Sequence, residues 1–79
     1  MPEIVMQDVT SSQIAAVGFG KDRPDQRVGT LQVTFIKSGK TWRYFGVPEE
    51  VLEDLMSAPS IGSFLNRAIR GHFDGEEVR

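Results

Sequence analysis

The chain has 79 residues and no cysteine. Disulfides, thiol catalysis and cysteine-based zinc sites are therefore excluded, and the fold depends on packing alone or on a partner subunit. No apolar run approaches the ~20 residues that cross a bilayer. The first residues, Met1-Pro2-Glu3, lack the basic and apolar regions of a signal peptide. We therefore expect a single cytoplasmic domain that does not enter a membrane.

Signatures of catalysis are also missing from the sequence. There is one histidine, His72, and a lone histidine without cysteine forms no usual metal site. No P-loop, dinucleotide-binding fingerprint or catalytic triad is recognisable, and turn formation accounts for Ser11 and Ser12. We therefore expect no enzyme activity, no cofactor and no metal. The enzyme interpretation would return if one cleft were lined by Ser11, Asn66, Arg70 and His72.

Basic residues are slightly outnumbered, with nine lysines and arginines against eleven acids, and the formal net charge is −2. This balance does not by itself indicate a nucleic-acid-binding protein. Two segments, 37–48 and 57–73, nevertheless contain cations and no acid. If these segments meet in space, a mildly acidic protein gains one basic face. The cations of the two segments are Lys37, Lys40, Arg43, Arg67 and Arg70.

The first half of the chain has the apolar runs and the alternation of apolar and polar residues that are typical of strands. This pattern predicts strands over residues 14–19 and 30–37, with a polar loop over 20–29 between them. Ser38-Gly39 then favours a tight hairpin turn, because glycine takes a positive φ at no steric cost. Residues 40–47 become the return strand.

The second half has the spacing and the end signals of two helices. Pro48 suits the first turn of a helix because its missing N–H needs no partner there, and Pro59 ends that helix. Ser60 is a suitable N-cap for a second helix that runs to Gly71. Such an N-terminus, with Gly62 behind the cap, can bind an anion, but a plain cap with close packing also accounts for these residues.

Strands followed by helices predict an α+β domain. We expect a three- or four-stranded antiparallel meander followed by two helices packed on one face. Residues 1–8 would be an N-terminal segment or a short edge strand, residues 9–73 the single domain, and residues 74–79 a disordered acidic tail.

Seven short segments occur in a characteristic order between Val9 and Phe73. They are Ser11-Ser12-Gln13-Ile14, Gly18-Phe19, Leu31 to Phe35, Ser38-Gly39, Trp42 to Pro48, Ala58 to Gly62, and Phe64 to Gly71. This order resembles the KTSC family, a small domain named for the C-terminus of some lysyl-tRNA synthetases and also found as a free-standing bacterial or phage protein. The resemblance implies a KTSC-like domain over residues 9–73, with RNA binding suggested for the family partly by its attachment to a synthetase.

The sequence departs from the family pattern at two places. The family's Tyr-x-Tyr is here Trp42-Arg43-Tyr44, which keeps a flat ring and loses one hydroxyl. His72-Phe73 follows Ile69-Arg70-Gly71, where a basic residue and a tyrosine are more usual.

Trp42 and Tyr44 have two possible roles. Two residues apart on a strand, they share a face, and with cations nearby they resemble a platform on which single-stranded bases stack. Their second possible role is in the core, because large aromatic residues are common there and could cover the apolar face of the preceding strand. Strict alternation adds a conflict: if Phe45 and Val47 face the core, then Trp42 and Tyr44 do not.

The sequence thus favours a non-catalytic module that binds RNA or another single-stranded nucleic acid through a basic and aromatic face. The alternative is a protein-interaction module, including a homodimer. Arg43, Arg67 and Arg70 would contact phosphates, and Trp42 or Tyr44 would stack a base. A solvated helix face, or ion pairs to Glu53 or Asp54, also explains Arg67 and Arg70. The residues predicted to bind nucleic acid are Lys37, Lys40, Trp42, Arg43, Tyr44, Arg67 and Arg70.

Overall fold

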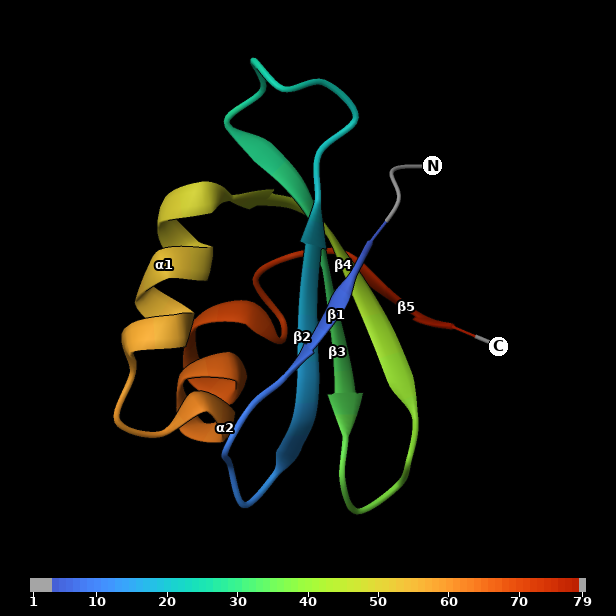
Figure 1. The fold of residues 1–79 in the computed structure, drawn as a ribbon, viewed down its shortest axis with the longest axis vertical. Coiled ribbons are helices and arrows are strands. Elements are labelled where there is room, and N and C mark those ends of the chain that lie inside the picture. The colour runs from blue at the N-terminus through green and yellow to red at the C-terminus, as the bar shows by residue number, and fades with distance from the viewer. Residues whose placement is uncertain (1–3, 79) are drawn as a thin grey trace.

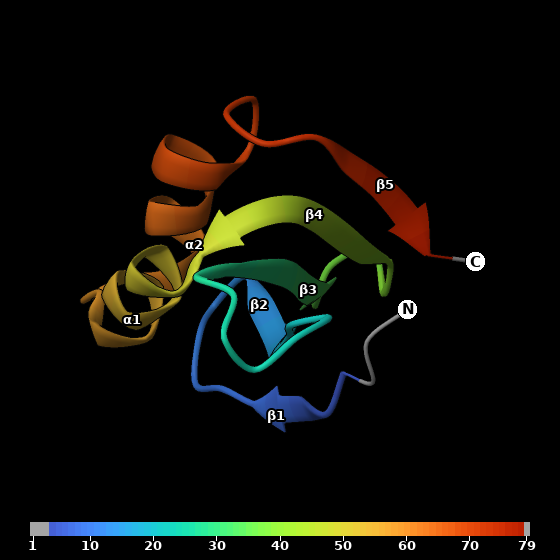
Figure 2. The ribbon, with the colours of Figure 1, turned by 90° about the horizontal axis from the view of Figure 1, so that it is seen from above.

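The computed structural model describes residues 4–78, which form a five-stranded antiparallel sheet with helices on one face (Figures 1 and 2). The strands follow one another in the sheet in chain order, so that each pairs with its neighbours as a meander. The predicted α+β class is confirmed, with more strands than expected. The elements are β1 (Met6–Asp8), β2 (Ile14–Gly20), β3 (Val28–Phe35), β4 (Thr41–Pro48), α1 (Glu49–Ser57), α2 (Ile61–Phe64), the π-helical turn η1 (Leu65–Ile69) and β5 (Gly75–Val78).

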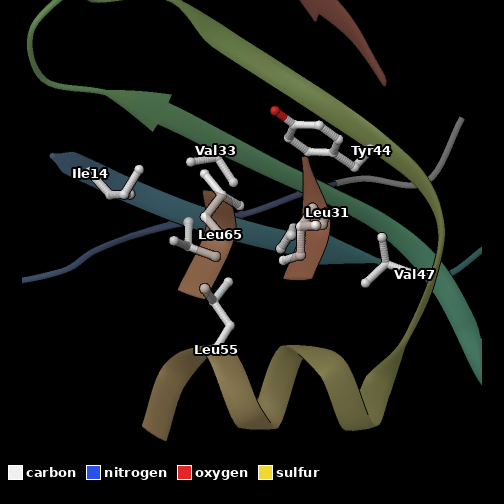
Figure 3. Close-up of a cluster of buried hydrophobic side chains, with 9 residues drawn as sticks. Ile14, Leu31, Val33, Tyr44, Val47, Leu55 and Leu65 are labelled. Atoms are coloured by element: carbon white, nitrogen blue, oxygen red, sulfur yellow. The ribbon is translucent and has the colours of Figure 1, made fainter. Parts of the chain in front are cut away.

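The core lies between the sheet and the helices (Figure 3). Alternate residues of a strand point to the same face of a sheet. In β2, β3 and β4 the residues that point toward the helices are apolar. Leu55 of α1 and Leu65 and Ile69 of η1 cover them and are almost completely buried. This packing fixes the position of the helical layer over the middle strands. The buried sheet residues of the cluster are Ile14, Val17, Leu31, Val33, Tyr44 and Val47.

A β-bulge in β4 removes the conflict in the alternation of this strand. Leu31 lies opposite Tyr44 and Gly29 lies opposite Val47, so two residues of β4 face a single residue of β3. Gly46 has a φ of 69°, which allows the extra residue to be accommodated. Tyr44 and Val47 therefore both point into the core, whereas Phe45 is exposed. The expected conflict does not arise, because only Val47 of the pair Phe45 and Val47 faces the core.

The hairpin between β3 and β4 is wider than the tight turn that Ser38-Gly39 predicted. The strands end at Phe35 and begin again at Thr41, so residues 36–40 form the connection. The backbone N–H of Gly39 donates to the carbonyl of Phe35 at 3.0 Å, and Gly39 has a φ of 70°. Glycine thus has the predicted role of taking a positive φ, within a longer loop.

The two predicted helices are present, and the second ends differently from expectation. Ser60 is its N-cap, with its Oγ accepting from the N–H of Ser63 at 3.3 Å. The chain then widens into η1, where the N–H of Arg70 donates to the carbonyl of Leu65 five residues earlier, at 2.9 Å. Gly71, with a φ of 81°, follows as the expected stop.

The acidic tail requires a correction, because Gly75–Val78 forms β5 and pairs with β4. Gly75 lies opposite Tyr44, and a Cβ at Gly75 would lie 2.8 Å from the Tyr44 ring. Glycine therefore leaves room for the ring to lie across the last strand. At the other edge, β1 covers Met6–Asp8, which agrees with a short edge strand within the expected N-terminal segment. Residues 1–3 and 79 of the expected terminal segments lie outside the described residues.

Candidate functional site

An open groove crosses the helix-covered face of the sheet where β4 meets the end of the helical layer. Its volume is about 670 Å³. We call it the β4 groove, because Trp42 and Tyr44 of this strand form part of its lining. The rest comes from η1 and the residue after it, the end of β3, the loop before β2 and the connection between β3 and β4. Its lining residues are Ser12, Gln13, Phe35, Lys37, Ser38, Trp42, Tyr44, Asn66 and Arg70.

The aromatic part of the β4 groove combines core and surface. Tyr44 belongs to the core and is only 5% exposed, whereas Trp42 and Phe35 are partly buried and pack against the core from its edge. Burial raises the pKa of the Tyr44 hydroxyl above its usual value of 10.0, and the positive charge of Arg70 opposes part of this rise. The core and platform interpretations of Trp42 and Tyr44 are therefore not exclusive, since the rings pack on the core and line the groove.

Three polar side chains form one wall of the β4 groove. Arg70 Nη1 donates to Asn66 Oδ1 at 3.1 Å, and Asn66 Nδ2 donates to Gln13 Oε1 at 3.4 Å. The guanidinium carbon of Arg70 also lies 5.9 Å from the centre of the Phe35 ring, within the range of a cation–π contact. The η1 turn brings Asn66 and Arg70 to this wall, and the loop before β2 brings Gln13.

The structure brings together four of the residues predicted to bind nucleic acid, because Lys37, Trp42, Tyr44 and Arg70 all line the β4 groove. Arg43 lies between Trp42 and Tyr44 on the same strand, so its side chain points to the opposite face of the sheet. There its Nε donates to Gln32 Oε1 at 2.9 Å. The strand alternation therefore removes Arg43 from the groove.

Lys40 and Arg67 also lie outside the lining of the β4 groove. Lys40 Nζ is 3.6 Å from Glu77 Oε1 on β5, so the expected tail supplies an acid to one of the predicted cations. The guanidinium carbon of Arg67 lies 5.7 Å from the centre of the ring of Phe64, the last residue of α2. Between residues 4 and 78, no ion pair joins Arg67 or Arg70 to Glu53 or Asp54.

The β4 groove does not unite the four residues that would favour an enzyme. Asn66 and Arg70 line it, but Ser11 and His72 do not. Ser11 Oγ accepts from the N–H groups of Gln13 and Ile14, at 3.2 and 3.3 Å, which is the turn role predicted for it. Across residues 4–78, no three His, Asp or Glu side chains group in a way that could hold a metal ion.

Sequence reasoning did not identify Ser12, Gln13, Phe35 and Ser38 as lining residues. Phe35 was recognisable as an inward residue of a strand, and its position at the strand end is what opens its ring to the groove. Gln13 stood within the family-like segment 11–14, but no role was assigned to it. Its place depends on Gly62, since a Cβ there would lie 2.6 Å from Gln13 Oε1. Gly62 thus permits the close packing that was one explanation of the helix start.

Comparison with known proteins gives consistent results. The KTSC domain model matches residues 10–73. A KTSC domain protein of known crystal structure from Yersinia pestis superposes with a TM-score of 0.82 and is 35% identical, covering 98% of this chain and 100% of its own. A protein of Tsukamurella paurometabola is 38% identical over 68 residues, which are 86% of this chain and 92% of the relative. A lysine–tRNA ligase of Nostoc punctiforme is 43% identical over 54 residues, which are 68% of this chain and 9% of the ligase.

The chain therefore belongs to the class of small α+β domains in which a helical layer between the fourth and fifth strands covers one face of an antiparallel meander. The chain is a member of the KTSC domain family, as its ordered motifs predicted. Family membership establishes the fold and does not specify a ligand. No helix within residues 4–78 is long and apolar enough to cross a membrane.

Proposed function

We propose that the domain is a non-catalytic module that binds single-stranded nucleic acid, RNA in particular, in the β4 groove. The observation that supports this proposal is the meeting of partly buried rings with two cations in one groove, which includes Trp42, Phe35, Lys37 and Arg70. Stacking of a base on an aromatic side chain contributes ~1–3 kcal/mol. Lys37 and Arg70 supply the positive charge that a neighbouring phosphate requires.

The size of the β4 groove favours an unpaired strand over a duplex. Its volume of about 670 Å³ is that of a site for a small molecule, and so fits one or a few nucleotide units. A base can stack in it only if it is not paired within a helix. The match to a protein named lysine–tRNA ligase supports RNA as the ligand class, because that name includes an RNA.

Two arginines on opposite sides of the sheet, Arg70 after η1 and Arg43 on β4, provide the test. Arg70→Gln and Arg43→Gln remove the same charge, but only Arg70 lines the β4 groove. We expect a fluorescently labelled single-stranded RNA of mixed sequence to bind the wild type at low salt, with a salt slope of about −1.4 for two phosphate contacts. Arg70→Gln should weaken binding about fivefold or more, and Arg43→Gln by less than about twofold.

Two results would overturn the proposal. One is the absence of any anisotropy change at low salt with the folded wild-type protein. The other is an equal loss of affinity in both variants, which would indicate a general effect of charge and no specific groove. The alternative function, a protein-interaction module, predicts a concentration-dependent mass in solution and an affinity that varies little with salt.

A further inference from the structure

The polar wall of the β4 groove has a fixed direction of hydrogen bonding. A guanidinium group only donates hydrogen bonds, so the Asn66 oxygen must face Arg70. The Asn66 amide nitrogen then faces Gln13, and the Gln13 oxygen must accept from it. Among the described residues nothing accepts from Gln13 Nε2. Arg70 therefore orients two amides in turn.

In this orientation the groups of the wall that have no partner within residues 4–78 are donors, and each amide oxygen already accepts one hydrogen bond. The Gln13 oxygen accepts from Asn66 Nδ2, and the Asn66 oxygen accepts from Arg70 Nη1. The remaining N–H groups of Gln13 and of the Arg70 guanidinium are therefore available to a ligand in the groove that both residues line. Gly62 reinforces this arrangement, because the Gln13 side chain packs closely against its backbone.

The direction of the donors discriminates between purines. A free glutamine or asparagine normally recognises adenine, since its oxygen accepts from N6 while its nitrogen donates to N7. That pattern is disfavoured here because each amide oxygen is turned toward a donor of the wall and already accepts one hydrogen bond from it. Guanine presents two acceptors, O6 and N7, on the same edge, and donors such as arginine recognise them. Unpaired bases in single-stranded RNA expose this edge.

We infer that Gln13, held by Asn66 and Arg70, is a specificity-determining residue through which the β4 groove selects an unpaired guanine over adenine. This inference rests on the proposed function and adds base recognition to it. Asn66 acts as a positioning residue, since its side chain fixes which end of the Gln13 amide faces the ligand.

The test compares three RNA pentamers that differ only at the central base: UUGUU, UUAUU and UUIUU, where I is inosine. Inosine keeps O6 and N7 of guanine but lacks its N2 amino group. We expect the guanine pentamer to bind the wild-type domain about fivefold to tenfold more tightly than the adenine pentamer. The inosine pentamer should bind within about twofold of guanine, because the recognised edge is the same.

Two substitutions should reverse the selectivity by different routes. Asn66→Asp accepts from both Arg70 and Gln13 Nε2, which turns the Gln13 oxygen toward the ligand. Gln13→Glu places a carboxylate oxygen at that position directly. Either change should lower the ratio of guanine to adenine affinity to about one or below. The added negative charge weakens both pentamers alike, so it cancels in the ratio. Gln7→Glu on β1, outside the groove, is the matched control and should keep the wild-type ratio.

The outcomes separate this inference from the proposed function. If the pentamers bind the wild type with equal affinity, or if folded Asn66→Asp and Gln13→Glu retain its ratio, the base-recognition role of Gln13 is overturned while nucleic-acid binding stands. If neither the pentamers nor an RNA of greater length binds, the inference and the proposed function are both overturned. The wild-type ratio alone decides the first case, so the inference remains testable even if a variant does not fold.

Discussion

At the scale of the residue, Tyr44 connects the core to the β4 groove. Its ring packs across Gly75 and among the buried apolar residues, and it is also part of the groove lining. Two opposed effects act on its hydroxyl, of which burial is the larger and the charge of Arg70 the smaller. Since Tyr44 is the single tyrosine of the chain, its ionisation can be followed without interference from another tyrosine.

We expect the pKa of Tyr44 to lie above 10.0 in the folded protein and to return to about that value in concentrated urea. Arg70→Gln should raise it further, because the charge that opposes the effect of burial is removed. Titration of the tyrosinate absorbance measures both shifts. A folded-state pKa at or below 10.0 would contradict the burial of the hydroxyl.

The same shift makes stability depend on pH in one direction. The folded state holds the Tyr44 proton more tightly than the unfolded state, so this contribution is complete below pH 10.0 and is lost as the pH rises through the folded pKa. Urea denaturation between about pH 9 and pH 11 should therefore show a steeper loss of unfolding free energy in the wild type than in Tyr44→Phe.

At the scale of the element, β4 depends on its bulge. The extra residue allows Tyr44 and Val47 to face the core together, although they are an odd number of positions apart. Without the bulge, one of the two would point to the opposite face of the sheet. Gly46 supplies the positive φ at which this occurs, and no heavy atom lies within 4 Å of where its Cβ would be. The cost of a substitution here is therefore conformational.

Gly46→Ala should lower the free energy of unfolding by about 1–2 kcal/mol, because alanine disfavours the left-handed region. Gly46→Asn should lose clearly less, since asparagine tolerates that region better. Equilibrium urea denaturation of the two variants measures the difference. Equal losses would indicate that crowding, and no backbone preference, limits this position.

The elements also show what the sequence could predict. Local patterns identified the strands around Leu31 and Trp42, the proline before α1 and the Ser60 cap, because each depends on neighbouring residues. The pairing of β5 was not predictable in this way. Its residues, Gly-Glu-Glu-Val, resemble a solvated tail, and they form a strand because β4 offers an unpaired edge.

The candidate site was predictable to a similar extent. Composition singled out Lys37, Trp42, Tyr44 and Arg70, which the β4 groove does bring together. Composition could not exclude Arg43 from the site, since the face of the sheet to which a side chain points depends on the strand register. It also gave no signal for Gln13, whose place depends on Asn66 and Gly62 far along the chain.

At the scale of the whole molecule, opposite charges meet across the β4–β5 pair. Glu77 lies opposite Trp42, and its carboxylate is paired with Lys40. The lysine side chain is 58% exposed, so the pair adds at most about 1 kcal/mol to stability. The greater effect of Glu77 should be that its negative charge, beside the groove, weakens the attraction for a polyanion.

We therefore expect Glu77→Gln to change the free energy of unfolding by less than about 0.5 kcal/mol and to strengthen RNA binding about twofold at low salt. Glu53→Gln makes the same change in net charge on the exposed side of α1, and it should leave RNA affinity nearly unchanged. Anisotropy titrations and urea denaturation measure the two effects. An equal gain in both variants would show that only the total charge matters.

The place of β5 also constrains the order in which the domain assembles. β1 to β4 pair with strands that adjoin them in sequence, whereas the partner of β5 is separated from it by the whole helical layer. Contacts between nearby segments close short loops and form early, and contacts across a long loop form late. During synthesis, the four-stranded meander can form before the last residues emerge. β4 would then gain β5 as its second neighbour only after β5 has been synthesised.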